Sequence, residues 1–455
     1  MTLEPAGARY VTDVPYVASF TPELAPAWLD TVATICGFAA PRHDGRRTWC
    51  ELGCGPGLAP LVFAATHPHD TFHGIDLMPE HVARGRAMAH DAGLGNLTLH
   101  ALDFDAACDL DLPPFDYIVA HGVYAWVDDA ATASMRRFIH RHLAQGGLVY
   151  LSYNAMPGWA ADSPFQHLIH ALAEHAPGTS LARFDMAAAT VQALRAAGAP
   201  SLVASPIAST LDVLRQRRYA SYFPHEYLAP AWRPRYVDEV RRDMAAIDLV
   251  PVGSATFRDN FDRLVVTTAA RQALDAIADP DQRELARDFF MAQAFRRDVF
   301  GRAPARIDDD ARRARLLDAW YALVQPPPLV RFSMSTEAGE VTFDTPAARA
   351  LVTRLAEGPG RLREGLADAP VDELLSAAIA LLCAGTVRPV SAAATDVGRI
   401  NDVLHRHRDP GAGPAHRVLS RGTALPIDDD LLAAVREVGG GADPRPWVEF
   451  LRRLD

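Results

Sequence analysis

The stretch that decides the fold is Thr48-Trp-Cys-Glu-Leu-Gly-Cys-Gly-Pro-Gly57, a short apolar run that passes directly into a glycine-rich turn. Because glycine has no Cβ, its backbone can adopt positive φ and a ligand can approach it closely. Gly53, Gly55 and Gly57 in such a turn indicate a nucleotide-like ligand. The next helix is expected to begin near Pro60, and its first backbone N–H groups would point back toward the same turn.

Strands and helices alternate after this turn, which predicts a parallel sheet with helices on its faces. The expected strands are 48–52, 71–76, 97–101, 117–121 and 147–153, with helices at 59–67, 79–92 and 130–143. Ligands bind outside the carboxyl ends of such strands, so the residues there should line one cleft. These residues are Glu51, Asp76, Asp103, His121, Gly122, Tyr153 and Asn154.

Composition excludes several classes of function. The chain has 455 residues, a net charge of −11 and no lysine, so a lysine base, a Schiff base and a P-loop lysine are excluded. The negative charge argues against a nucleic-acid partner. No apolar run is long enough to cross a bilayer and the first residues do not resemble a signal peptide, so we expect a cytoplasmic protein without membrane insertion. Five scattered cysteines favour reduced thiols over disulfides, and no metal site is expected.

The order of the glycines separates two classes of cofactor. A dinucleotide fingerprint would need its third glycine at Leu58, whereas the chain has it at Gly57. The run Glu51-x-Gly-x-Gly-x-Gly57, followed by Gly-Ile-Asp76-Leu, instead resembles the class I S-adenosylmethionine-dependent methyltransferases. The resemblance implies S-adenosylmethionine as cofactor, S-adenosylhomocysteine as product and no metal.

The same resemblance implies a role for each part of the cofactor site. The segment Gly53 to Gly57 would wrap the amino-acid end of the cofactor, Asp76 would bind both ribose hydroxyls, and Asp103 with Phe104 would flank the adenine. The full implied set of cofactor-binding residues is Glu51, Gly53, Cys54, Gly55, Gly57, Asp76, Leu77, Asp103, Phe104, His121 and Gly122.

A second resemblance narrows the family. Four segments are similar to bacterial methyltransferases with a methyltransferase regulatory domain, a group that includes lysine methyltransferases of outer-membrane proteins. They are Asp-Val-Pro-Tyr16, His121-Gly-Val-Tyr-Ala-Trp126, Ser152-Tyr-Asn-Ala-Met-Pro-Gly-Trp159 and Pro224-His-Glu-Tyr-Leu228. The chain departs from the family pattern at Thr12-Asp13 and Ala25-Pro26.

The acceptor site is expected on the loops after the fourth and fifth strands. If the acceptor is a lysine amine, burial between aromatic walls would favour its neutral form. Tyr153 and Asn154 are candidate catalytic residues that would position the amine. Candidate substrate-contacting residues are Tyr16, Tyr124, Trp126 and Trp159, for which core packing is the alternative.

The rest of the chain is divided by composition and pattern. We expect an α/β protein: a doubly wound, mostly parallel seven-stranded methyltransferase sheet with a helical insertion and a C-terminal α+β winged-helix-like domain. The expected parts are an N-terminal helical arm (1–45), the cofactor core with five strands (46–160), a helical insertion over the cleft (161–232), the completion of the sheet (233–302), a charged helical connector (303–329) and the C-terminal domain (330–455). The last domain is expected to contain three helices.

Three functions remain open on the sequence alone. The first is methyl transfer to lysine side chains of a protein substrate. The second is methylation of a small metabolite or glycan precursor, because one cofactor domain serves many acceptors. The third is a cofactor-binding regulator without turnover. A C-terminal module with 15 arginines against 18 acidic residues in 331–455 is a poor DNA binder. The oligomeric state stays open, a dimer included.

Overall fold

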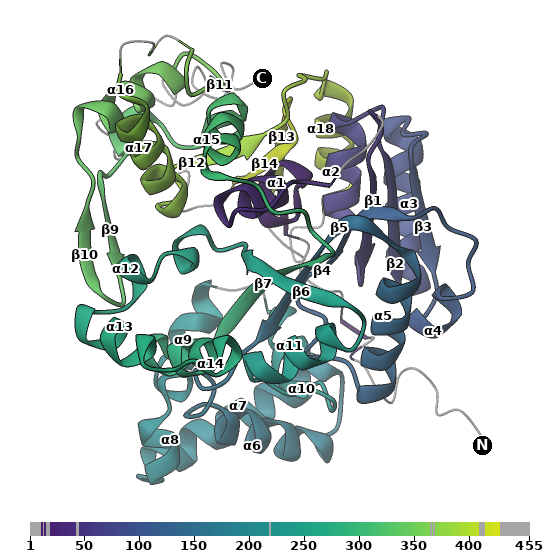
Figure 1. The fold of residues 1–455 in the computed structure, drawn as a ribbon. Coiled ribbons are helices and arrows are strands. Elements are labelled where there is room, and N and C mark those ends of the chain that lie inside the picture. Colours follow the sequence, from purple (N-terminus) through teal and green to yellow (C-terminus); the bar gives the residue numbers. More distant parts are fainter. Residues whose placement is uncertain are drawn as a thin grey trace.

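The computed structural model describes residues 11, 13–14, 19–41, 45–217, 220–364, 366, 369–408 and 415–427. A seven-stranded sheet in the order β3-β2-β1-β4-β5-β7-β6 runs through its centre (Figure 1). Strands β1 to β5 pair in parallel, and β7 runs antiparallel between β5 and β6. The strands are β1 Thr48–Leu52, β2 Thr71–Asp76, β3 Leu97–Ala101, β4 Phe115–Ala120, β5 Leu143–Asn154, β6 Leu249–Ser254 and β7 Phe295–Arg302. The predicted doubly wound, seven-stranded sheet is confirmed.

Helices cover both faces of this sheet because its strands are apolar on both sides. In β1, Trp49 packs in the same core as helices α1 to α3, whereas the next residue, Cys50, packs in the core formed with α5 and α11. Successive side chains on a strand point to opposite faces, which explains this division. The helices are α1 Pro26–Ile35, α2 Leu58–Thr66, α3 Pro79–Ala92, α4 Phe104–Ala107, α5 Asp129–His142 and α11 Val237–Ala245.

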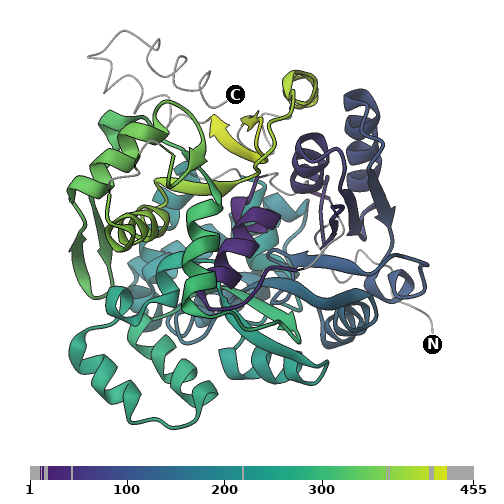
Figure 2. The ribbon, with the colours of Figure 1, turned by 45° about the horizontal axis from the view of Figure 1, so that its top comes forward.

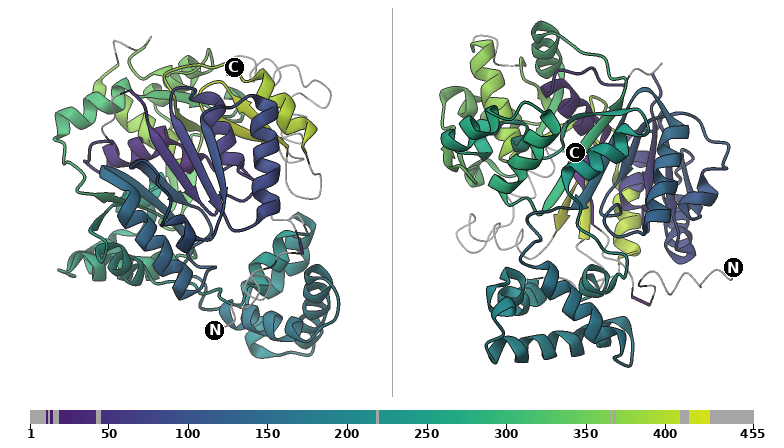
Figure 3. Two further views of the ribbon diagram at one scale, coloured as in Figure 1. Left: turned by 90° about the vertical axis from the view of Figure 1, so that its right-hand side faces the viewer. Right: turned by 60° about the horizontal axis from the view of Figure 1, so that its bottom comes forward.

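Five helices between β5 and β6 form a separate group at one end of the sheet (Figure 3). Phe165, Phe184, Phe223 and Tyr227 lie in the apolar cluster that holds this group together. Its last helix contacts the sheet, since the Nδ2 atom of Asn154 at the end of β5 donates to Glu226 Oε1 over 3.3 Å. The five helices are α6 Ser163–Glu174, α7 Ser180–Ala196, α8 Pro200–Ala204, α9 Pro206–Arg217 and α10 Tyr222–Leu228.

A second group of elements lies between β6 and β7 in the chain. It covers the edge of the sheet that β6 forms. Helix α14 (Pro280–Met291) contacts α11, and the short helix η3 (Phe257–Asn260) follows β6 directly. Helices α12 (Asp262–Val265) and α13 (Thr268–Asp275) connect η3 to α14. These elements therefore belong to the same body as the sheet that β6 and β7 complete.

The C-terminal part differs from the expected order of elements in two ways. Residues 303–329 contain helix α15 (Asp309–Asp318) but also strand β8 (Trp320–Leu323), which pairs with β11 and β12 of the C-terminal part. The segment is therefore more than a connector. In addition, the described residues of 358–370 form the short strand β11 (Gly360–Arg361) and turns where a middle helix was expected.

The remaining elements of the C-terminal part alternate between strands and helices. A hairpin of β9 (Ser333–Thr336) and β10 (Gly339–Thr342) precedes α16, and a second hairpin of β13 and β14 closes the described chain. The other elements are η4 Pro327–Leu329, α16 Pro346–Leu355, α17 Val371–Cys383, β12 Val387–Val390, α18 Gly398–Arg406, β13 Ala415–Leu419 and β14 Thr423–Ile427. Residues 428–455 of the predicted C-terminal domain lie outside the described residues.

The C-terminal part packs directly against the first helices of the chain, as Figure 2 shows for the yellow hairpin beside the purple helices. Polar contacts fix the same interface: Thr395 Oγ1 donates to Thr66 O over 3.0 Å, and His407 Nε2 lies 2.9 Å from Asp91 Oδ2. One apolar core consequently continues from α2 into the β13–β14 hairpin.

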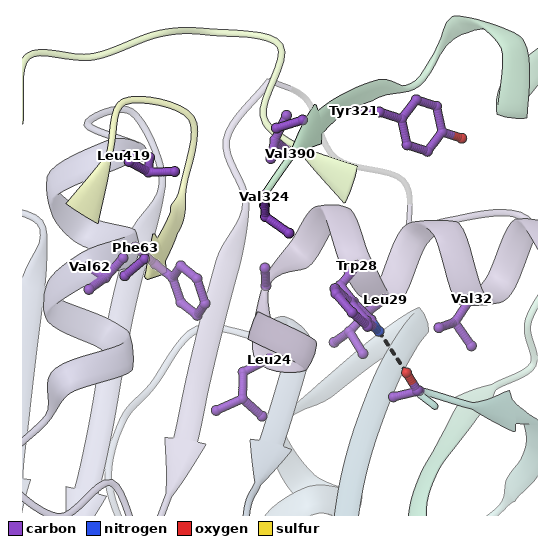
Figure 4. Packing of buried hydrophobic residues seen from close by; sticks show 14 of the residues in the cluster. Leu24, Trp28, Leu29, Val32, Val62, Phe63, Tyr321, Val324, Val390 and Leu419 are labelled. Atoms are coloured by element: carbon purple, nitrogen blue, oxygen red, sulfur yellow. Dashed lines mark hydrogen bonds between the residues drawn. The ribbon is translucent and has the colours of Figure 1, made fainter. Parts of the chain in front are cut away.

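Helix α1 occupies the middle of this shared core (Figure 4). Its residues Trp28, Leu29 and Val32 are buried, and Trp28 Nε1 donates to Ala255 O over 2.8 Å. The helix contacts β6, α15 and β12, so it joins the sheet to the C-terminal part. Its apolar face at i, i+1 and i+4 spacing is the pattern expected of a helix packed on several sides.

We expect Leu29→Ala to destabilise the protein by about 2–5 kcal/mol, because it removes a fully buried leucine and leaves a cavity. The matched control is Leu194→Ala on α7, where the leucine is 42% exposed and the cost should lie within about 0.5 kcal/mol. Urea denaturation followed by circular dichroism measures both changes. Equal midpoints for the two variants would contradict the packing role of α1.

Candidate functional site

A cavity of about 960 Å³ opens at the carboxyl ends of β1, β2 and β4. Residues from the turns after these strands line it, together with residues of α4, α5 and α10. Ligand cavities in open α/β sheets lie at this end of the strands, as the sequence predicted. The predicted site residues on its wall are Glu51, Gly53, Cys54, Gly55, Asp76, Leu77, Asp103, Phe104, His121, Gly122 and Trp126.

The glycine turn shapes one wall of the cavity. Gly53, Gly55 and Gly57 adopt φ values of 74°, 55° and 79°, which only glycine tolerates well. A Cβ on Gly53 would lie 2.5 Å from Val123 Cγ2, whereas a Cβ on Gly55 would meet nothing within 4 Å. The open space beside Gly55 is therefore available to a ligand. Gly57 does not line the cavity, and it is the N-terminal cap of α2.

Asp76 fixes this turn against the next strand. Its Oδ2 atom accepts a hydrogen bond from Gly55 N over 2.7 Å, and its Oδ1 atom accepts one from Met78 N over 2.9 Å. The Nδ1 atom of His81 lies 3.3 Å from the same Oδ1. Because carboxylate oxygens have several lone-pair sites, these contacts leave room for a ligand to donate as well.

Glu51 places a second carboxyl group at the base of the cavity. Its side chain is 6% exposed, and its buried Oε2 atom has no hydrogen-bond partner. Burial, together with the negative charge of Asp76, raises the pKa of the Glu51 carboxyl to about 8. A buried carboxyl without a partner is costly, so the position suits a cationic group of a ligand.

Two further walls come from the ends of β3 and β4. Asp103 caps α4 by accepting from Ala106 N over 2.7 Å, which places Phe104 at the cavity. His121 Nδ1 lies 2.9 Å from Tyr150 Oη and 3.1 Å from Ser152 Oγ. Burial and the charge of Arg297 lower the pKa of His121 to about 3, so its ring is neutral near pH 7.

Trp126 and Asn154 connect the cavity to the helical group after β5. Trp126 lines the cavity, and its Nε1 donates to Asn154 Oδ1 over 3.2 Å. Asn154 Nδ2 in turn donates to Glu226 of α10. Asn154 is buried and lies behind Trp126, so its contact with the cavity runs through that ring.

The structure does not bring Tyr153, Tyr124 or Trp159 to the cavity. Tyr153 is fully buried, and its hydroxyl donates to Asp298 Oδ2 over 2.6 Å on the side of β7. The Tyr124 hydroxyl donates to Asp243 Oδ2 over 2.8 Å. The Trp159 ring packs edge-on against Trp232. Tyr124 and Trp159 therefore pack in the core, which was the alternative stated for them, and the candidate catalytic residue Tyr153 is a core residue as well. Tyr16 lies outside the described residues.

Several lining residues were missed in the sequence. His225, His81, Arg137 and Ser19 come from four different elements or loops, and no local spacing relates them. His225 alone lay within a motif that the sequence singled out, Pro224-His-Glu-Tyr-Leu228. Within the described ranges, no group of three or more histidine, cysteine or acidic residues could hold a metal ion.

This fold and this site define a class of enzyme. A seven-stranded sheet with one antiparallel strand, a glycine-rich turn after β1 and a carboxylate at the end of β2 are the features of a class I S-adenosylmethionine-dependent methyltransferase. The methyltransferase-domain model matches residues 50–149, and the model of the predicted methyltransferase regulatory domain matches residues 219–302.

Two relatives match the chain at the sequence level. An uncharacterized protein of Synechocystis is 32% identical over 357 residues, which cover 78% of this chain and 70% of that protein. An uncharacterized protein of Rickettsia prowazekii is 31% identical over 159 residues, 34% of this chain and 62% of that protein. The chain belongs to the methyltransferases that carry this regulatory domain, and it uses S-adenosylmethionine.

A solved structure shows the same fold over nearly the whole chain. PKMT2 from Rickettsia typhi in complex with AdoHcy is 19% identical, covers 96% of both chains and has a TM-score of 0.67. The residues present here fit such a ligand: the buried Oε2 of Glu51 lacks a partner, and no Cβ fills the space beside Gly55 and Gly122. None of the helices in the described ranges is long and apolar enough to span a membrane.

We expect S-adenosylmethionine binding near pH 7 to release a proton from Glu51. The carboxyl is mostly protonated below its raised pKa of about 8, and the positive charge of the ligand favours the carboxylate, so affinity should rise as the pH approaches 8. The stability of the protein without ligand should change in the opposite direction. Because folding raises the pKa of Glu51 from 4.5 to about 8, the free energy of unfolding should fall as the pH rises through this range.

Calorimetry in two buffers of different ionisation enthalpy measures this proton release. The matched variant Glu51→Gln keeps the shape of the side chain and cannot titrate, so its binding enthalpy should be independent of the buffer. An unchanged proton release in Glu51→Gln would show that another group titrates.

Proposed function

We propose that the enzyme transfers methyl groups to lysine side-chain amines of a protein substrate. The observation that carries this proposal is the hydrogen-bonded row of Trp126, Asn154 and Glu226 at the edge of the cavity. An aromatic ring backed by a buried carboxylate suits a long apolar side chain that ends in a cation. The resemblance of four sequence segments to bacterial protein lysine methyltransferases supports the same acceptor.

The donor would be bound by residues that already line the cavity. Gly55 and Gly122 leave open space for it, Glu51 offers a carboxylate to its amino group, and Asp76 offers oxygens to its ribose. Cys54, Gly53, Leu77, His121, Asp103 and Phe104 would complete the contacts, the last two beside the adenine. Gly57 would act indirectly, because it sets the start of α2.

Methyl transfer requires the protein to position the acceptor, and it does not require a nucleophilic side chain of the enzyme. When bound, S-adenosylmethionine supplies a methyl group on a positively charged sulfur. The chain must hold the acceptor nitrogen in line at about 3–3.5 Å from that carbon. Trp126, fixed by Asn154, would form the wall along which the amine enters, and burial there favours the neutral amine. Tyr153 would contribute by fixing the end of β5 through Asp298.

The parts outside the cofactor core would hold the substrate protein. Helix α10 brings His225 to the cavity and Glu226 to Asn154, which places the helical insertion 161–232 beside the proposed acceptor entrance. We infer that the insertion contacts the substrate chain around the target lysine. The amount of structure beyond the sheet favours a macromolecular acceptor over a small one.

A lysine-blocking experiment tests this function. Bacterial proteins are divided in two, and the lysines of one half are acetylated before both halves are incubated with the enzyme and methyl-labelled S-adenosylmethionine. The chain contains no lysine, so the enzyme cannot contribute a lysine signal of its own. We expect protein-bound label only in the unblocked half, released as methyl-lysine on acid hydrolysis.

The control for this experiment is Asp76→Ala, which binds the donor more weakly and should therefore label the unblocked half less at a low concentration of the donor. Equal labelling of blocked and unblocked proteins would exclude lysine as the acceptor. Label found only in small molecules would exclude a protein substrate altogether.

A further inference from the structure

The carboxylate of Asp76 has fewer open acceptor positions than a ribose needs. Its Oδ1 atom accepts from Met78 N over 2.9 Å and lies 3.3 Å from His81 Nδ1. Its Oδ2 atom accepts from Gly55 N over 2.7 Å. The two oxygens of a carboxylate offer about four lone-pair sites in all. These contacts with the protein therefore leave about one site for a ligand, and it lies on Oδ2.

The ribose of S-adenosylmethionine carries two hydroxyl groups. The resemblance to the class I methyltransferases implied that Asp76 binds both of them, which requires two open lone-pair sites. With its contacts to Gly55, Met78 and His81 in place, Asp76 can accept one hydroxyl. The second hydroxyl then needs another acceptor on the wall of the same cavity.

His81 lies on that wall, directly beside Asp76. It is the third residue of α3 (Pro79–Ala92), and only Leu77 and Met78 separate this helix from the end of β2. The His81 side chain is 22% exposed, so the ring is not sealed in the core. The ring is therefore accessible from the cavity at the strand end where the ribose is expected.

The contact with Asp76 determines which ring nitrogen of His81 can accept. An ionised carboxylate only accepts hydrogen bonds, so the hydrogen between Asp76 Oδ1 and His81 Nδ1 belongs to Nδ1. In the neutral ring Nε2 is then the acceptor. Among the described residues, the ring makes no hydrogen bond other than the one with Asp76, which leaves Nε2 for a ligand.

The other two imidazole groups on the cavity wall are used elsewhere. His121 Nδ1 lies 2.9 Å from Tyr150 Oη, and His225 Nε2 lies 2.9 Å from the carbonyl oxygen of Val14. Neither of them contacts Asp76, whereas His81 does. His81 is thus the imidazole that belongs to the ribose end of the site.

We propose that His81 is a second ribose-binding residue of the cofactor site. Asp76 Oδ2 accepts one ribose hydroxyl and His81 Nε2 accepts the other. The hydrogen bond between His81 Nδ1 and Asp76 Oδ1 orients the ring for this contact. The proposal rests on the use of S-adenosylmethionine and does not depend on the identity of the methyl acceptor.

Calorimetry with AdoHcy and its 2′-deoxy and 3′-deoxy analogues tests this contact. The variant His81→Phe keeps an aromatic ring and removes both ring nitrogens. Its phenyl ring also covers the side of Asp76 Oδ1 that faces His81, so the carboxylate cannot take over the hydroxyl. We expect His81→Phe to bind AdoHcy about three- to tenfold more weakly than wild type does, the usual worth of one hydrogen bond.

The analogues separate a contact with ribose from a general effect on the site. The analogue that lacks the hydroxyl bound by His81 should bind His81→Phe and wild type equally, whereas the other analogue should show the full loss. The matched control is His90→Phe on the same helix, where the side chain is 90% exposed and all three affinities should stay unchanged.

A second variant makes the result independent of the phenyl ring. The amide of His81→Gln can donate to Asp76 and accept a hydroxyl, so it should recover part of the AdoHcy affinity that His81→Phe loses. An equal loss of affinity for AdoHcy and both analogues would show that His81 binds no hydroxyl. Unchanged AdoHcy affinity in His81→Phe would assign the second hydroxyl to another group, for example Glu51. Either result would overturn the proposal.

Discussion

The hydrogen bond from Gly55 N to Asp76 Oδ2 is the contact on which the shape of the cofactor site depends. It joins the turn after β1 to the end of β2, and Gly55 itself adopts a positive φ. Glu51, near the end of β1, is buried at the base of the same cavity. Burial and the negative charge of Asp76 raise the pKa of the Glu51 carboxyl, so ionising it is costly unless a cation is bound beside it.

Strands β5 and β7 connect the cofactor cavity to a second cavity, which lies between β6, β7, η3 and α14. On β5, Asn154 holds Trp126 at the cofactor cavity, while the preceding residue, Tyr153, binds Asp298 of β7. Asp298 also lines the second cavity and pairs with Arg296. Alternation along a strand explains how neighbouring residues reach opposite sides.

The sheet was predictable because alternating strands and helices, and glycines in a turn, are local signals in the sequence. The cofactor residues followed, since they sit at strand ends whose position the alternation determines. The burial of Tyr153, Tyr124 and Trp159 away from the cavity could not be predicted. Their partners, which are Asp298, Asp243 and Trp232, are distant in the chain. Strand β8 was missed for the same reason, as its pairing partner β12 follows about sixty residues later.

The most direct measurement is the affinity for S-adenosylmethionine of wild type and Asp76→Ala, by calorimetry at one pH. Loss of the carboxylate removes the contact that holds Gly55 and the proposed ribose partner, so binding should weaken by about 1.5–3 kcal/mol. Asp109→Ala, an exposed carboxylate after α4, should bind as wild type does. Unchanged affinity in Asp76→Ala would contradict the central role of this carboxylate.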